Sequence, residues 1–276
     1  MNINHVFDAH LTYLKQKSYI GSSTIKSAVK SDLEYIYGID NSSEPTSSQS
    51  FGTALHMAVL EPELFEQHYF TIDDDKKPVK DATWAKAENK AYKEAVIADN
   101  GGKDCLSVSE YKACALVTKR LKNDFRGHIS LEPAVKESSF YADDWYGDED
   151  GVVNVKIRPD FFKPNLLGDV KSTKSPDPKG FYWEFFKYGY DIQLALYRQV
   201  LRDYGHTIDK TTILAVGNGA PYCHEWYTIP EDILEKGKEK YLYGLSRIVQ
   251  IKNGNSSDKY GIGFRDEDDF IILDRY

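Results

Sequence analysis

The chain has 276 residues, of which 41% are hydrophobic and 28% are charged, so it can form a sizeable core. Its formal net charge of −8 argues against a protein that coats nucleic acid with its whole surface. No apolar run reaches the roughly 20 residues of a membrane helix, and the N-terminus lacks the basic start and apolar middle of a signal peptide; we therefore expect a cytoplasmic location and no membrane partner.

The charge is distributed unevenly along the chain. Basic residues are frequent from Lys156 to Arg202, whereas acids dominate the last segment, RDEDDFIILDRY. A basic channel on an acidic body therefore stays compatible with the negative total.

The cysteines indicate no disulfide framework. Cys105, Cys114 and Cys223 are odd in number and form no CxxC pair. This pattern predicts free thiols, and it argues against a zinc site or an iron–sulfur cluster, which normally takes four Cys thiolates.

Helices dominate the first half of the predicted structure. A helical pattern over 22–37 is followed by a loop over 38–50 that is rich in Ser, Asn and Pro. A second helix opens near Ser50 and carries FGTALHMAVL, and Pro62 begins a further helical turn. Two more helices are predicted, over 81–99 and 107–125.

The second half predicts a sheet with helices packed on it. Short segments rich in β-branched and aromatic residues predict three strands joined by tight turns, over 134–142, 152–162 and 165–173. Further along the chain we expect two helices broken at Tyr188-Gly189-Tyr190, two strands, and a long helix, over 178–187, 191–203, 211–219, 223–229 and 230–252.

This order of elements predicts an α/β or α+β fold, with a central mixed sheet flanked by helices and an N-terminal helical addition. We expect a single domain over 1–276. Residues 1–130 would form its mainly helical part, and residues 131–276 its sheet-containing catalytic core.

Two carboxylates and one ammonium group are predicted to meet where two strands end. Asp160 ends one strand and Asp169 lies late in the next, so a hairpin would bring them together; Lys171 then points to the same face as Asp169. The Val170 side chain would face the buried side, and its carbonyl is a candidate metal ligand. Carboxylates hold Mg²⁺, and an ammonium orients or helps deprotonate a metal-bound water or stabilises phosphate charge, as phosphodiester hydrolysis requires. The structural alternative is a surface ion pair beside a Pro-Asp turn.

Three further segments carry side chains that fit such a site, each with a structural alternative. His56 lies on a helix among small and apolar residues, where a buried, hydrogen-bonded His is the alternative. Gln193 and Tyr197 lie four apart on one helix face, which an ordinary amphipathic helix would also show. Glu137 would share a face with Ser139 by strand alternation, unless it is a solvated strand acid.

These segments, in this order, resemble the PD-(D/E)xK nuclease superfamily, and more narrowly the C-terminal nuclease domain of RecE (exodeoxyribonuclease VIII) and its phage-borne relatives. The similarity runs from about Ser18 to the C-terminus, and FGTALHMAVLEPELFEQHY is its most specific block. KESSFY, KIRPDFF, GDVKST and YGYDIQLALYRQVL follow. The familiar DLKT appears here as DVKS, and Asp169 stands where many superfamily members have Glu.

The resemblance implies a role for each matching residue. Asp160 and Asp169 match the two metal-binding acids, and Lys171 matches the catalytic Lys. His56 matches a helix His that contacts metal or stabilises phosphate, and Glu137 matches an acid found before the core pair.

The resemblance also implies residues that position the substrate. Gln193 and Tyr197 match a Q-x-x-x-Y motif, which helps position the DNA strand and the site. Arg158, Lys174 and Arg198 are candidates to grip phosphates.

The function implied by the resemblance is a Mg²⁺-dependent DNA exonuclease, with Mn²⁺ as a substitute. It would degrade linear double-stranded DNA from 5′ ends and leave 3′ single strands for an annealing protein in recombination. A ring-shaped homo-oligomer with basic residues inside would reconcile the net charge with DNA binding. Three alternatives stay open: an endonuclease or single-strand nuclease of the same superfamily, a catalytically silent DNA-binding relative, and an unrelated α/β protein with surface ion pairs.

Overall fold

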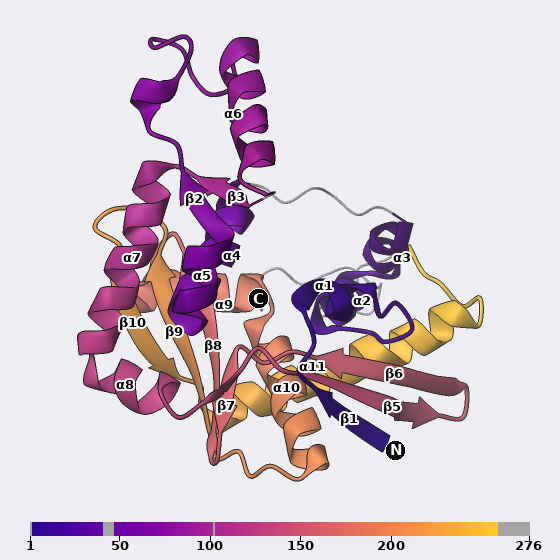
Figure 1. Cartoon of the computed structure of the whole chain (residues 1–276). Helices are drawn as coiled ribbons and strands as arrows, with labels where there is room; N and C mark the ends of the chain where they lie inside the picture. Colours follow the sequence, from indigo (N-terminus) through magenta and orange to yellow (C-terminus); the bar gives the residue numbers. More distant parts are fainter. Residues whose placement is uncertain (1, 41–46, 102, 259–276) are drawn as a thin grey trace.

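The computed structural model describes residues 2–40, 47–101 and 103–258 (Figure 1). Its helices are α1 (His10–Lys15), α2 (Ser22–Lys30), α3 (Asp32–Asp40), α4 (Ser47–Leu60), α5 (Pro62–His68), the 3-10 helix η1 (Asp74–Lys76), α6 (Ala87–Asp99), α7 (Val108–Asn123), α8 (Phe125–Leu131), α9 (Pro178–Lys187), α10 (Tyr190–Tyr204) and α11 (Glu231–Lys252). Its strands are β1 (Asn2–Val6), β2 (Tyr69–Thr71), β3 (Asp104–Leu106), β4 (Val135–Lys136), β5 (Ser139–Asp148), β6 (Gly151–Ile157), β7 (Phe161–Lys163), β8 (Leu166–Thr173), β9 (Lys210–Gly217) and β10 (His224–Thr228).

A five-stranded mixed sheet in the order β10-β9-β8-β7-β4 forms the centre of the fold. Strands β8 and β9 are parallel, and the other neighbours are antiparallel. A three-stranded sheet, β1-β5-β6, extends to the side along α11 (Figure 1), and β2 pairs with β3 in a separate small sheet. The predicted mixed sheet flanked by helices is confirmed.

Helices cover both faces of the five-stranded sheet. On β8, Leu167 packs into a core formed with α2, α9, α10 and α11. Leu166 and Val170 pack into a second core formed with α4, α5 and α7. The Val170 side chain therefore faces a buried layer, as predicted, while Asp169 and Lys171 alternate with it. None of the helices among the described residues combines the length and apolar character needed to cross a bilayer.

The structure corrects the prediction that 134–142, 152–162 and 165–173 form one three-strand unit. The first two segments each divide between two sheets: β4 and β7 lie in the five-stranded sheet, whereas β5 and β6 lie in the three-stranded sheet. Both strands bend at the same level, one at Glu137, which has a φ of 49°, the other around Pro159. A left-handed residue breaks strand alternation, and Pro cannot donate a ladder hydrogen bond. Asp160 consequently lies between β6 and β7.

The predicted helices form with shifted ends. The helix expected over 22–37 divides at Ser31, which is extended and whose hydroxyl accepts a hydrogen bond from the Glu34 N–H, so α3 begins with its own cap. The helix expected over 81–99 begins only at Ala87, because the Asn89 side chain bonds to the backbone of preceding turn residues. Of the predicted loop over 38–50, residues 41–46 lie outside the described ones.

The break predicted at Tyr188-Gly189-Tyr190 is confirmed. Gly189 has a φ of 61° and precedes α10 directly. This left-handed conformation favours glycine, which has no Cβ to clash with its own backbone.

The short elements of the N-terminal segment were not predicted. Strand β1 pairs with the edge of β5, with Val6 opposite Ser139. The buried Lys156 ammonium donates to the carbonyls of Tyr13 (2.7 Å) and Gln16 (3.0 Å). These long-range contacts fix β1 and α1 against the three-stranded sheet, and they leave no pattern in the local sequence.

A glycine next to the site provides a test of the sheet. Gly168 lies opposite Phe161 in the β7–β8 pair, and a Cβ at Gly168 would collide with the buried Phe161 ring. We expect Gly168→Ala to lower the free energy of unfolding by about 1–3 kcal/mol in urea, because the ring has to shift within a packed core. Gly38→Ala, on α3 with nothing within 4 Å, is the control and should cost nothing. Equal unfolding midpoints for both variants would contradict the packing described.

Candidate active site

Side chains gather at the level where the β4–β5 and β6–β7 segments leave one sheet for the other. The Glu137 N–H donates to the Asp160 carbonyl across this junction (3.2 Å). Arg158 donates from Nε to Glu137 Oε2 (2.8 Å) and also bonds to Ser139 Oγ (2.8 Å). Glu137 and Ser139 thus converge on one guanidinium, although alternation is not the reason. At this bend Glu137, Ser139 and Arg158 come together.

Asp160 and Asp169 meet across the β7–β8 pair, as the hairpin reasoning predicted. The Val170 N–H donates to Asp160 Oδ2 at 2.6 Å. Lys171 Nζ lies 2.5 Å from Asp169 Oδ2. The predicted pair of carboxylates with one ammonium group is therefore formed, and it is almost inaccessible: Asp160 is 7% and Asp169 1% exposed.

His56 joins this pair to Glu137. Its Nε2 lies 2.5 Å from Asp160 Oδ2, and its Nδ1 lies 2.9 Å from Glu137 Oε1. One ligand atom from each of the three residues lies within 4.8 Å of the others. Helix α4 therefore brings His56 to the sheet junction as a member of the polar cluster, where its hydrogen-bonding partners are the two carboxylates.

The electrostatics of the buried pair are asymmetric. Burial and the negative charge of Asp160 raise the pKa of Asp169 to about 6, although Lys171 opposes them. Burial also acts to raise the pKa of Asp160, but His56 and Lys171 hold it below its ordinary value. Two carboxylates this close cannot both be ionised without nearby cations.

The two cationic partners are held in their charged forms. Burial disfavours charge on Lys171, yet Asp169 and Asp160 raise the pKa of the Lys171 ammonium well above its ordinary value. In the same way, burial lowers the pKa of His56, but Asp160 and Glu137 raise it to about 10. Lys171 is thus a donor and a source of positive charge, so it is suited to stabilising an anion.

Helix α10 supplies the next layer of the site. Gln193 Nε2 donates to Asp169 Oδ1 (2.9 Å), and its Oε1 accepts from Lys26 Nζ (2.9 Å). Tyr197, four residues on, is buried; burial raises the pKa of its hydroxyl to about 12 against a hydrogen bond with Ser22. Gln193 thus holds one oxygen of Asp169 while Lys171 holds the other.

Of the three basic residues expected to grip phosphates, two lie in ion pairs. Arg158 contacts Glu137 and Asp8, and Arg198 contacts Glu231 and Glu235 on α11. Both guanidinium groups are less than a tenth exposed, so their positions give them a structural role. Lys174 is exposed beside the site, just after β8, and its contact with a phosphate stays a prediction.

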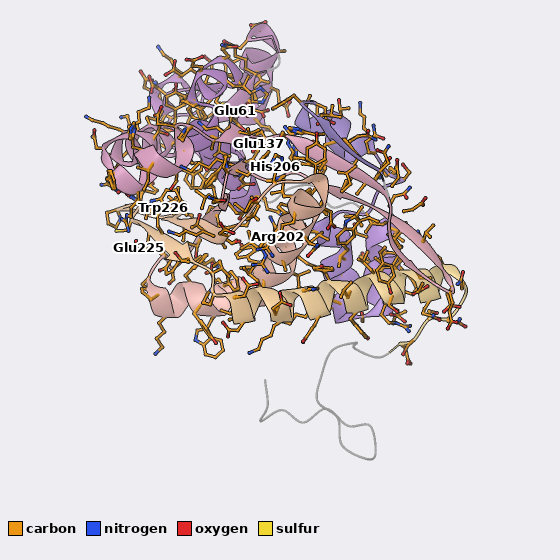
Figure 2. All side chains as sticks on the ribbon, turned by 90° about the horizontal axis from the view of Figure 1, so that it is seen from below. Glu61, Glu137, Arg202, His206, Glu225 and Trp226 are labelled. Atoms are coloured by element: carbon orange, nitrogen blue, oxygen red, sulfur yellow. The ribbon has the colours of Figure 1, made fainter. Side chains whose placement is uncertain are left out.

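Three charged residues of the site were missed by the sequence reasoning. Lys26 comes from α2, and Asp8 from the N-terminal segment, where its carboxylate accepts from Ser139, Tyr141 and Arg158. Glu61 precedes α5; burial and the charge of Glu137 raise the pKa of Glu61, and Figure 2 labels both glutamates. Only Glu61 carried a usable signal, since it lies within the most specific sequence block.

The donor set fits a divalent cation. Asp160, Asp169 and Glu137 offer carboxylate oxygens, and His56 would offer an imidazole nitrogen once it has given up its proton; together they suit Mg²⁺ or Mn²⁺. Arg158 contacts Glu137 and also Asp8, so four carboxylates face the three cations Lys171, His56 and Arg158. A further positive charge would therefore be stabilised here. The Val170 carbonyl stays a predicted ligand.

A mixed sheet that brings Pro159-Asp160 and Asp169-Val170-Lys171 together under two layers of helices defines a PD-(D/E)xK domain. The sequence profile of the PDDEXK-like domain of unknown function DUF3799 matches residues 21–262. The chain belongs to this family, and the predicted relation to the PD-(D/E)xK superfamily is confirmed.

A solved structure shows the same fold. The crystal structure of a candidate exonuclease from Eubacterium rectale superimposes with a TM-score of 0.62 at 15% identity, covering 91% of this chain and 89% of that chain. A phage related exonuclease from Haemophilus somnus 129PT is 13% identical over 86% of this chain and 96% of that chain, with a TM-score of 0.32, too low to carry an argument. No curated protein matches the sequence.

Metal binding can be tested without an activity assay. A ligand that binds only the folded state raises its stability, by about 2.7 kcal/mol at 100 times the Kd, so saturating Mn²⁺ or Mg²⁺ should raise the melting temperature by about 5 °C. Asp160→Asn should abolish most of this rise, because the amide keeps the Val170 hydrogen bond but loses the charge. Asp99→Asn, at the exposed end of α6, should keep it. The same rise in all three proteins would place the ion elsewhere.

The role of Gln193 predicts a difference in stability between two glutamines of one helix. Gln193→Leu leaves the buried Asp169 Oδ1 and the Lys26 ammonium without their partner, and should cost about 1–3 kcal/mol of unfolding free energy. Gln199→Leu removes an exposed hydrogen bond to Asp203 and should cost less than about 0.5 kcal/mol. Urea unfolding measures both; similar costs would refute the bridging role.

Proposed function

We propose that this protein is a Mg²⁺-dependent DNA exonuclease, with Mn²⁺ as a substitute. The observation that supports it best is the buried pair Asp160 and Asp169 with Lys171 beside it, because phosphodiester hydrolysis needs a cation, an activated water and stabilisation of phosphate charge at one place. Membership of a PDDEXK-like family and the name of the Eubacterium rectale neighbour agree with this proposal.

The residues of the chain divide the chemistry between them. Asp160, Asp169 and Glu137 would hold the divalent ion, with His56 completing its surroundings. When bound, such an ion stabilises negative charge on a phosphate and makes water at the site a stronger acid.

Lys171 contributes positive charge that is already in place. Its ammonium is fixed by Asp169 and lies 5.1 Å from the centre of the Tyr190 ring. It can donate to a non-bridging phosphate oxygen and so stabilise the charge that develops there, with little reorganisation. Gln193 keeps Asp169 in the orientation that this contact requires.

The finer parts of the proposal come from the family resemblance. They are attack on double-stranded DNA ends in the 5′-to-3′ direction, a single-strand annealing protein as partner, a role in recombination, and a ring-shaped homo-oligomer. A cytoplasmic location accompanies them. The second candidate is an endonuclease or single-strand nuclease built on the same site, and the third is a silent DNA-binding relative, against which the complete Asp, Asp and Lys set argues.

One digestion experiment separates these candidates. End-labelled linear duplex, a closed circle and a single strand are incubated with protein in Mg²⁺, Mn²⁺ or a chelator. An exonuclease degrades the linear duplex only with metal and leaves the closed circle intact. Cutting of the circle favours the endonuclease. Preference for the single strand favours the single-strand nuclease. Binding without any cleavage favours the silent relative.

Substitutions then assign the activity to the site. We expect Lys171→Met and Asp169→Asn each to lower the cleavage rate by about 10²-fold or more, because each removes a charge that acts on the reacting phosphate or its cation. Lys210→Met, at the far end of β9, should leave the rate unchanged. Full activity in Lys171→Met with a folded protein would refute the assignment.

A further inference from the structure

A large cavity adjoins the candidate active site. It has a volume of about 1000 Å³ and lies between α2, the end of β8 and the α9–α10 junction. The cluster of His56, Glu137 and Asp160 is not part of its wall, so it is a separate space. The residues that it shares with the surroundings of the site are Lys26, Ser172 and Tyr190.

The wall of the cavity carries an excess of positive charge. Five lysines line it, and the acids that face them are Glu184 and Asp191. Asp191 is paired with Lys240 (2.6 Å), and Glu184 accepts a hydrogen bond from the Thr173 hydroxyl (2.5 Å).

The three outer lysines are not neutralised. Lys30, Lys174 and Lys187 are exposed, and the structure shows none of them in an ion pair with any residue it describes. Exposed ammonium groups grouped around a cavity are suited to binding phosphates along a backbone.

Aromatic rings lie among these lysines. Tyr188, at the α9–α10 break, lines the cavity and is 48% exposed, with Lys187 Nζ 5.5 Å from the centre of its ring. Tyr190 also lines it, with Lys26 Nζ at 5.4 Å and Lys171 Nζ at 5.1 Å from its ring centre. Lysines interleaved with exposed aromatic rings are the arrangement that holds unpaired bases and their phosphates. Bases inside a duplex offer no free face for such stacking.

The cavity lies next to the reacting groups without including them. Tyr190 contacts the ammonium groups of both Lys171 and Lys26, and Ser172 directly follows Lys171. A chain that leaves the cavity past Tyr190 would therefore pass close to Lys171. The part of the DNA strand inside the cavity would be unpaired, either before or after it passes the point of cleavage.

We propose that this cavity binds a segment of single-stranded DNA, with Lys174 and Lys187 on its phosphates and a base against Tyr188. The biological role of this binding rests on the proposed nuclease function, but the binding itself requires neither metal nor cleavage. It predicts that the protein separates the strands at the substrate end, or receives them separated, before a strand enters the site.

The test measures binding in a chelator, so cleavage cannot interfere. Fluorescence anisotropy compares a labelled single-stranded oligonucleotide with a blunt duplex of the same length. Lys174→Ala/Lys187→Ala should raise the Kd for the single strand about tenfold and reduce the log–log salt slope by about 1.4, which is 0.7 for each of two phosphates. Tyr188→Ala should raise the Kd by about tenfold, and Tyr188→Phe should restore it, because the ring provides the stacking.

The matched control removes two lysines elsewhere. Lys122 lines a small, separate pocket of about 60 Å³ beside α8, and Lys210 lies at the other end of β9, about 20 Å along the strand. Lys122→Ala/Lys210→Ala should leave the single-strand Kd unchanged. The inference is overturned if the cavity and control variants weaken the single strand equally, or if the cavity variants weaken only the duplex.

The two proposals fail in different ways. If wild-type protein cleaves no DNA in Mg²⁺ or Mn²⁺ but the cavity variants lose single-strand binding, the cavity assignment stands and the nuclease proposal falls. If cleavage depends on Lys171 while single-strand binding ignores Lys174, Lys187 and Tyr188, the cavity assignment alone is wrong.

Discussion

The structure depends on two buried carboxylates, Asp160 and Asp169, which a single antiparallel strand pair brings near each other. Isolated carboxylates are very costly to remove from water. Here the Val170 N–H and His56 hold Asp160, while Gln193 and Lys171 hold Asp169. The elements that reach the site each supply a group that contacts one of the two carboxylates. These groups converge at the sheet junction.

The arrangement is costly for folding and useful for binding a cation. Replacing buried ion pairs by apolar residues is often neutral or stabilising, so a core of this size has no need of them for stability alone. Four carboxylates, Asp8 included, face the three cations Lys171, His56 and Arg158, so the cluster is short of positive charge. A site that keeps its acids close together with unequal pKa values is suited to a divalent ion. Binding such an ion explains the burial of these carboxylates more directly than stability does.

Sequence reasoning could reach the parts of this site that depend on local pairing. Asp160, Asp169 and Lys171 follow from one hairpin and the two-residue strand period, and the structure brings them together as expected. His56 and Gln193 are far from them in the chain, and only the resemblance assigned them. Lys26 and Asp8 could not be found, because their positions depend on how α2 and the N-terminal segment pack.

The division of the predicted strands between two sheets has a similar cause. A single left-handed residue, Glu137, and one proline, Pro159, bend neighbouring segments at the same level, and neither signal alone distinguishes a turn from a change of sheet. The same bend explains why Arg158, a candidate to grip phosphates, lies between Glu137 and Asp8. The division of the strands and the position of Arg158 thus have one cause.

The negative charge of the chain and the lysines of the cavity are compatible for a physical reason. Residues 265–276 alone contain five acidic and two basic residues, so the net charge of −8 is spread unevenly along the chain. Salt screens exposed charges over about 8 Å, and Lys30, Lys174 and Lys187 therefore act on a phosphate nearby while distant acids do not. A net charge describes solubility and long-range steering. Recognition at the site is decided within one screening length, where the described residues around the cavity are predominantly cationic.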